Sequence, residues 1–139
     1  MRRSLILLFL VAGCHAPLPE PPQYPMTGEA PALDRMGAAD VAADLQRIIA
    51  TRVTPSDGTI AVSGNDPAID KALLPLLKAN GYRVWSKSKR EISYTVGKLG
   101  PALLVRLRID DLSAARLYYA DPETGRIVPA SPASMTEAG

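Results

Sequence analysis

Five residues near the start of the chain, Leu10-Val11-Ala12-Gly13-Cys14, have the types and the order needed for lipid modification and proteolytic processing. The small residues Ala12 and Gly13 leave the backbone accessible to a signal peptidase, and the Cys14 thiol can take a diacylglyceryl group. Cleavage before Cys14 frees an amine that can receive a further acyl chain such as palmitate. Because each buried methylene contributes about 0.8 kcal/mol, two or three chains hold a protein firmly on a membrane. The pattern therefore predicts signal cleavage at Ala12-Gly13 and lipidation of Cys14.

Residues 1–13 support this interpretation because they have the layout of a secretory signal peptide. Two arginines precede an apolar run that ends at Ala12, and this run is much shorter than the roughly 20 residues that span a bilayer. The alternative is an ordinary signal peptide that contains a cysteine. His15 follows Cys14 where an aspartate commonly retains bacterial lipoproteins in the inner membrane. We therefore expect an outer-membrane lipid anchor with the folded domain facing the periplasm.

The other titratable residues form no recognisable catalytic or metal-binding motif. His15 is the only histidine and lies beside the predicted lipidation site, which excludes histidine-based acid–base catalysis in the folded domain. Asp66 and Asp70 lie four residues apart on a predicted helix, where a helix cap and a solvated helix face explain them. Asp110-Asp111 is typical of a turn. We therefore expect no enzymatic activity, no metal site and no cofactor.

Arg106 and Arg108 have the clearest binding chemistry, because they alternate with apolar residues and so project from one face of a predicted strand. Basic side chains there can contact an acidic protein surface, lipid headgroups or DNA, although a half-buried sheet needs a polar outer face in any case. The net charge of +2 falls to zero once residues 1–13 are removed, and aromatic residues are few. This composition argues against direct DNA binding. Contact with a protein partner at Arg106 and Arg108 stays a hypothesis.

Composition divides the chain into four segments. These are a lipoprotein signal peptide (1–13), the lipidated Cys14 with a proline-rich tether (14–33), an α+β periplasmic domain (34–128) and a loose tail (129–139). The tether has six prolines and no basic residue after Ala16, which favours an extended polyproline II spacer of about 3.1 Å per residue. The alternative is a strap that docks on a partner through Tyr24 and Met26.

Hydrophobic periodicity predicts the fold of residues 34–128. Apolar residues recur at helical spacing after Asp34, and again between a cap at Asp66-Pro67 and a stop at Asn80-Gly81, with a short strand at 59–63 between the two helices. After Gly81 the period falls to two. The expected strands there carry Tyr82 and Val84; Ile92, Tyr94 and Val96; Leu103, Val105, Leu107 and Ile109; and Ala115, Leu117 and Tyr119, with a further short strand at Ile127-Val128 left open. The prediction is an α+β fold in which two helices pack on one face of a small, mainly antiparallel sheet, in the order αβαβββ.

Several segments of this pattern occur together behind the lipidation motif. They are Asp66-Pro67, Leu77-Lys78-Ala79-Asn80-Gly81-Tyr82-Arg83-Val84, Ile92–Val96, Leu103–Ile109, Ala115–Tyr118 and Gly125–Pro132. The arrangement resembles the TrbH family of conjugal-transfer lipoproteins over most of the mature chain. The resemblance implies a structural subunit of the type IV secretion apparatus, in the mating-pair-formation set that builds the channel and pilus for plasmid transfer. Such a subunit would hold the periplasmic core complex at the outer membrane, with core-complex subunits as its partners.

Two other functions stay open on the sequence alone. One is an assembly-factor lipoprotein for an outer-membrane barrel or a secretin. The other is an envelope lipoprotein that carries a small apolar or glycan ligand between its sheet and its helices.

Overall fold

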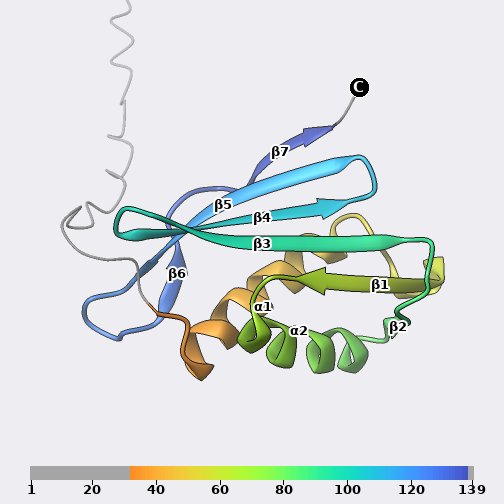
Figure 1. The fold of residues 1–139 in the computed structure, drawn as a ribbon, viewed down its shortest axis with the longest axis horizontal. Coiled ribbons are helices and arrows are strands. Elements are labelled where there is room, and N and C mark those ends of the chain that lie inside the picture. Colours follow the sequence, from red (N-terminus) through yellow and green to blue (C-terminus); the bar gives the residue numbers. More distant parts are fainter. Residues whose placement is uncertain (1–31, 138–139) are drawn as a thin grey trace, which may run out of the picture.

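The computed structural model describes residues 32–137, which form one sheet with two helices packed against it (Figure 1). The predicted signal peptide, the cleavage site Ala12-Gly13, the lipidation site Cys14 and the tether up to residue 31 lie outside the described residues. Within them the fold is α+β, with two α-helices and a seven-stranded mixed sheet. No helix in this part of the chain has the length and apolarity needed to cross a membrane.

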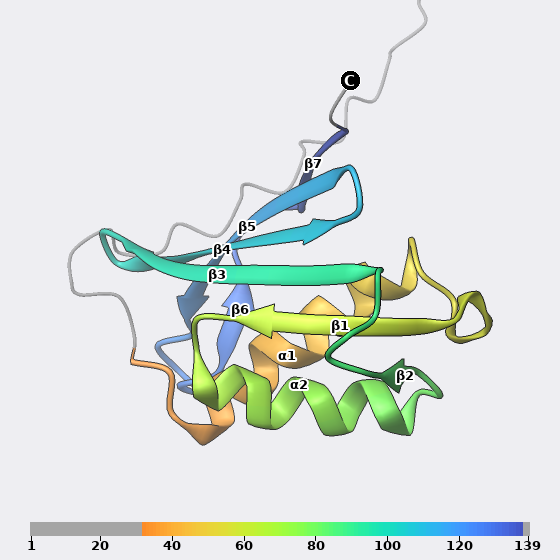
Figure 2. The ribbon, with the colours of Figure 1, turned by 45° about the vertical axis from the view of Figure 1, so that its right-hand side comes forward.

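Each α-helix begins at an aspartate whose side chain accepts hydrogen bonds from free backbone N–H groups. Asp34 caps α1 (Arg35–Ala50) by accepting from the Gly37 N–H at 2.7 Å. Asp66 caps α2 (Pro67–Ala79) by accepting from the N–H groups of the second and third helical residues at 2.9 and 3.1 Å. These caps satisfy donors that have no partner inside the helix. The two helices pack against each other on one side of the sheet (Figure 2).

Seven strands form the sheet, and α2 connects the first of them to the second. They are β1 (Thr59–Gly64), β2 (Arg83–Val84), β3 (Glu91–Leu99), β4 (Ala102–Ile109), β5 (Leu112–Ala120), β6 (Ile127–Pro129) and β7 (Ser134–Glu137), with a 3-10 turn at Pro55–Asp57 before β1. Strands β3, β4 and β5 form an antiparallel meander. Strands β6 and β7 both pair with β5, and each covers a different half of its outer edge.

The predicted element order αβαβββ is wrong, because the described residues have one strand before α2 and six after it. Across the sheet the strands lie in the order β2-β1-β3-β4-β5-β6, so β1 lies between β2 and β3 and is parallel to both. The reason is that α2 follows β1 and carries the chain back along the sheet, so the next strand enters in the same direction as β1. Strand β2 therefore lies at the far edge, away from the meander. Residues 134–137 form β7 where the sequence predicts a loose tail.

The apolar core fills the space between the helices and one face of the sheet. Its largest buried members come from both layers: Val41, Leu45, Ile49, Ile69, Leu73 and Leu77 from the helices, and Ile60, Ile92, Tyr94, Leu107 and Tyr118 from the strands. Leu33, the last residue of the predicted tether, also packs against this core. One face of the sheet is thereby covered, and side chains at the alternate positions of β3, β4 and β5 lie on the other face.

Asn65 marks the point where the pairing between β1 and β3 ends. Its side-chain amide donates to the Val96 carbonyl at 3.0 Å and its side-chain oxygen accepts from the Val96 N–H at 2.8 Å. The last backbone pair before it is Gly64 with Tyr94. The Asn65 side chain thus takes the place of one more strand residue along the edge of β3.

Candidate functional site

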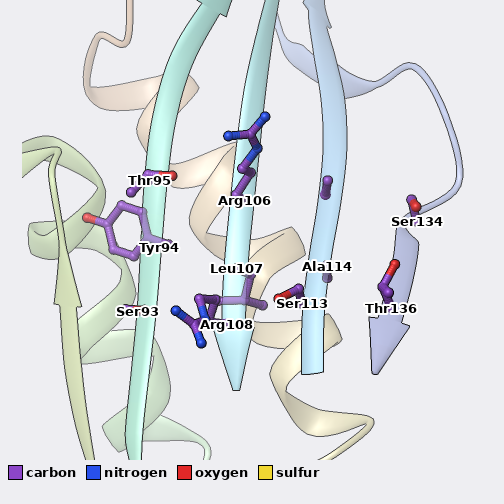
Figure 3. Close-up of a pocket in the computed structure, with 11 residues that line it drawn as sticks. Ser93, Tyr94, Thr95, Arg106, Leu107, Arg108, Ser113, Ala114, Ser134 and Thr136 are labelled. Atoms are coloured by element: carbon purple, nitrogen blue, oxygen red, sulfur yellow. The ribbon is translucent and has the colours of Figure 1, made fainter. Parts of the chain in front are cut away.

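The face of the sheet that is not covered by helices contains two rows of side chains across four strands. The first row is Thr95, Arg106, Ala115 and Ser134, and the second is Ser93, Arg108, Ser113 and Thr136. We call these eight residues the open-face site. Figure 3 shows the helices behind the strands, with the two arginines on β4 and the hydroxyl side chains on β3, β5 and β7.

The open-face site is hollow because long side chains stand beside short ones. Thr95 and Ala115 flank Arg106, while Ser93 and Ser113 flank Arg108. These small neighbours leave a hollow of about 260 Å³ over β3, β4, β5 and β7. Both arginines are exposed. The sheet therefore presents two accessible guanidinium groups above a floor of hydroxyl and methyl groups.

Neither guanidinium of the site has an acidic partner among residues 32–137. In the same half of the chain, Arg90 and Arg126 are each paired with an aspartate, Arg90 with Asp110 at 2.8 Å. The carboxylates of Asp110 and Glu91 line an adjoining hollow together with Arg108. Asp110 is bound by Arg90, and the Glu91 carboxylate accepts from the Ser63 hydroxyl at 3.3 Å. The charge of the two open-face arginines is therefore not neutralised within the domain.

Arg116 lies on the opposite face of the sheet from Arg106 and Arg108. Its guanidinium donates to both carboxylate oxygens of Asp44 in α1 at 2.8 and 2.9 Å and to the Ser131 carbonyl at 2.8 Å. The Tyr118 hydroxyl also donates to Asp44, which is only 5% exposed. Burial first, and then the Asp44 carboxylate, raise the pKa of the Tyr118 hydroxyl far above its usual value. This cluster fastens α1 to β5 and does not contribute to the open-face site.

The burial of β5 shows which of its side chains lie beside the two arginines. Its buried residues are Leu112, Ala114 and Tyr118, so Ser113, Ala115 and Leu117 lie on the open face. Apolar residues occupy both faces of β5, so alternation alone does not identify the core side. Of the open-face site, the sequence singles out only Arg106 and Arg108. Ser134 and Thr136 could not be placed beside them, because the sequence predicts no strand there.

The far half of the open face is apolar. Leu104 and Leu117 are cross-strand neighbours in one row with Gly97 of β3, and both leucines are half-buried. Leu99, at the end of the β3–β4 hairpin, is 55% exposed. The open face thus combines a basic, hydroxyl-rich half with an apolar half.

A second, larger hollow lies along the helix layer. It has a volume of about 1020 Å³, and its lining includes four alanines of the two helices, Ala39 and Ala43 from α1 and Ala68 and Ala72 from α2. Arg35 and Lys71 stand among the charged residues of its lining. Small apolar residues alone do not select a ligand, so the lining of this hollow does not indicate what kind of molecule would bind there.

The fold and the open-face site define a small α+β domain with one covered and one accessible sheet face, and comparison with known proteins assigns it to a family. The family described as conjugal transfer protein TrbH matches residues 20–139, which is most of the chain. The chain therefore belongs to the TrbH family of conjugal transfer proteins, and the family resemblance noted in the sequence is confirmed. Comparison with curated proteins and with solved structures gave no significant match.

Membership of this family places the chain among the proteins of conjugal transfer and is consistent with a role in a type IV secretion apparatus. The match includes the whole α+β domain and both rows of the open-face site. The assignment of Arg106 and Arg108 as partner-binding residues stays a prediction, as do lipidation of Cys14 and cleavage at Ala12-Gly13.

Proposed function

We propose that this protein is an outer-membrane-anchored lipoprotein that acts as a structural subunit of a conjugative type IV secretion apparatus. In this proposal Cys14 carries the lipid anchor after cleavage at Ala12-Gly13, and residues 14–31 link the anchor to the domain in the periplasm. The domain contributes contacts to other subunits and no catalytic step. The match of residues 20–139 to a conjugal transfer family is the observation that carries the proposal.

The geometry supports a contact role for the open face rather than a ligand-carrying role for the core. The space between the sheet and the helices is filled by buried apolar side chains from both layers. The open face, in contrast, is accessible and contains two guanidinium groups without an acidic partner among the described residues. An unneutralised basic surface of this kind favours association with an acidic surface.

The test combines protein chemistry with a transfer assay. Donor cells that lack the chain are complemented with the wild type or with Cys14→Ser, and the cells are separated into membrane and soluble fractions. We expect the wild type in the outer-membrane fraction, with an intact mass that shows acylation at an N-terminal Cys14. We expect Cys14→Ser to lack acylation and to be absent from the outer-membrane fraction, with a large fall in plasmid transfer.

The outcomes separate the proposed function from its alternatives. An unmodified wild-type protein in the soluble fraction would contradict the lipoprotein assignment. Normal transfer in the deletion strain would contradict the role as a subunit. If the acylated protein is needed instead for insertion of an outer-membrane barrel or secretin, its loss will reduce the amount of that protein in the membrane even in cells without a transfer apparatus.

A further inference from the structure

The two arginines of the open-face site have a fixed spacing because they are alternate residues of β4. Two residues of a strand cover about 6.6–6.8 Å, so the Cα atoms of Arg106 and Arg108 are separated by about that distance and both side chains point to the same side. A second extended chain has the same repeat. Carboxylates at alternate residues of such a chain therefore match this spacing.

The volume of the hollow limits what can enter it. About 260 Å³ lies just below the range of roughly 300–1,000 Å³ that is typical of pockets for drug-sized ligands, and it is enough for a few side chains. A whole helix, about 10–12 Å in diameter, is too wide for this space. The side chains from one face of an extended segment are of the right size.

The charges and the floor of the site favour carboxylates as the groups that enter it. Planar guanidinium groups bind carboxylates through paired hydrogen bonds. The hydroxyl groups of Ser93, Ser113 and Thr136 stand in the same row as Arg108 and can donate to the remaining carboxylate oxygens. None of the eight residues is aromatic, and Tyr94, which also lines the hollow, is only 2% exposed, so the site offers no accessible ring on which a base of single-stranded nucleic acid could stack. A second copy placed face to face would bring arginines against arginines.

We propose that the open-face site binds an extended acidic segment of a protein partner, with two carboxylates two residues apart contacting Arg106 and Arg108. This inference rests on the proposed function as a subunit of the transfer apparatus. The basic half of the face selects the acidic residues of the segment, and the apolar half around Leu104 and Leu117 lies next to it for flanking apolar side chains. Electrostatic complementarity of this kind sets partner choice and register.

The experiment uses the full-length lipidated chain in donor cells, with the photo-crosslinking residue p-benzoylphenylalanine at Thr136 on the border of the site. After irradiation, the crosslinked peptide is sequenced by mass spectrometry. We expect a protein peptide with aspartate or glutamate at alternate positions. The charge reversal Arg106→Glu with Arg108→Glu should lower the crosslink yield about tenfold or more. Replacing the two identified carboxylates of the partner with lysine should restore the yield in the charge-reversed chain.

Two controls keep the result specific to the site. Lys71→Glu reverses one positive charge at an exposed position of α2 and should leave the crosslink yield unchanged. Arg106→Gln with Arg108→Gln removes the charges without reversing them and should give an intermediate loss. Circular dichroism of each variant checks that the domain is folded.

The inference is overturned if the crosslink forms with phospholipid, with a second copy of the chain or with a segment that lacks carboxylates. It is also overturned if charge reversal leaves the yield unchanged, or if the lysine replacements in the partner fail to restore it. These outcomes do not decide the proposed function, since transfer that depends on the chain and on Cys14 would still support a structural subunit. Normal transfer without the chain would remove the proposed function itself.

Discussion

Replacing Gly64 with alanine tests how the tip of β1 is packed against β3. An alanine Cβ at this position would lie 2.0 Å from Cζ of Tyr94 and 2.1 Å from one of its Cε atoms, far inside van der Waals contact. The ring cannot move away freely, because the Tyr94 hydroxyl donates to the Asp66 carbonyl at 2.8 Å and is close to the Asp70 carboxylate. Gly64 thus provides the space in which the Tyr94 ring lies, between β1 and the start of α2.

The expected magnitude follows from two opposing effects. Forcing a methyl group into a filled space costs about 1–3 kcal/mol in the free energy of unfolding. The same substitution without a clash stabilises by about 0.4–1 kcal/mol, because alanine has less conformational freedom than glycine in the unfolded chain. We therefore expect Gly64→Ala to destabilise the wild type by about 2 kcal/mol. In a Tyr94→Leu background, which lacks the ring atoms that clash, it should be neutral or slightly stabilising.

The assay is urea unfolding of the four chains of this double-mutant cycle, followed by far-ultraviolet circular dichroism. With a slope of about 1–3 kcal/mol per molar urea, Gly64→Ala should lower the midpoint by about 1 M in the wild type only. Gly97→Ala is the matched control, because a Cβ there meets no atom within 4 Å. The reasoning is refuted if Gly64→Ala and Gly97→Ala have equal effects, or if the penalty at Gly64 is the same with Tyr94→Leu.

Two further predictions concern the ion pairs between α1 and the sheet. Asp44→Ala should lower the free energy of unfolding by about 3–5 kcal/mol, because it leaves the partly buried Arg116 unpaired. Arg90→Gln should lower it by less than about 1 kcal/mol, because the aspartates that pair with Arg90 are exposed. Urea titration compares the two variants, and equal losses of stability would contradict the buried role of Asp44. The Arg126 guanidinium, through its hydrogen bonds, holds the pKa of Asp40 below its usual range in the folded protein. A folded-state pKa below the unfolded value of about 3.9 stabilises the fold above that value, and this contribution is lost as the pH falls through the folded pKa. The difference in urea midpoint between the wild type and Asp40→Asn should therefore be largest at neutral pH and shrink below about pH 4, and a difference that grows on acidification would contradict the assignment.

The parts of the fold that the sequence predicts are those with strong local signals. Asp66 followed by Pro67 has the chemistry of a helix start, and α2 begins there. Arg106 and Arg108 alternate with buried residues of β4 and are found on the open face, as the period of two predicts. At these positions the local sequence pattern and the tertiary structure agree, so the local pattern alone predicts the observed structure.

The parts that the sequence did not predict depend on contacts between distant residues. Strand β2 has only two residues, and its position beyond β1 is set by how α2 crosses the sheet. Strand β7 is polar and exposed, and it is held by backbone pairing with β5 and by the ion pair of Glu137 with Arg52 at 3.2 Å. Arg116 gives no local sign that it reaches Asp44, which lies 72 residues earlier in the chain. Of the eight residues of the open-face site, the sequence singles out only Arg106 and Arg108, because the neighbours of these arginines are set by strand pairing.

The side chain of Asn65 has a consequence for how copies of this protein can come together. An exposed strand edge is a template on which strands of other chains can add, and such addition leads to open-ended polymers and aggregation. Asn65 occupies both backbone hydrogen-bonding groups of Val96, so an incoming strand finds no free donor or acceptor at that residue. This single side chain therefore blocks strand addition at the part of β3 that extends beyond β1, without a further strand or a helix to cover it.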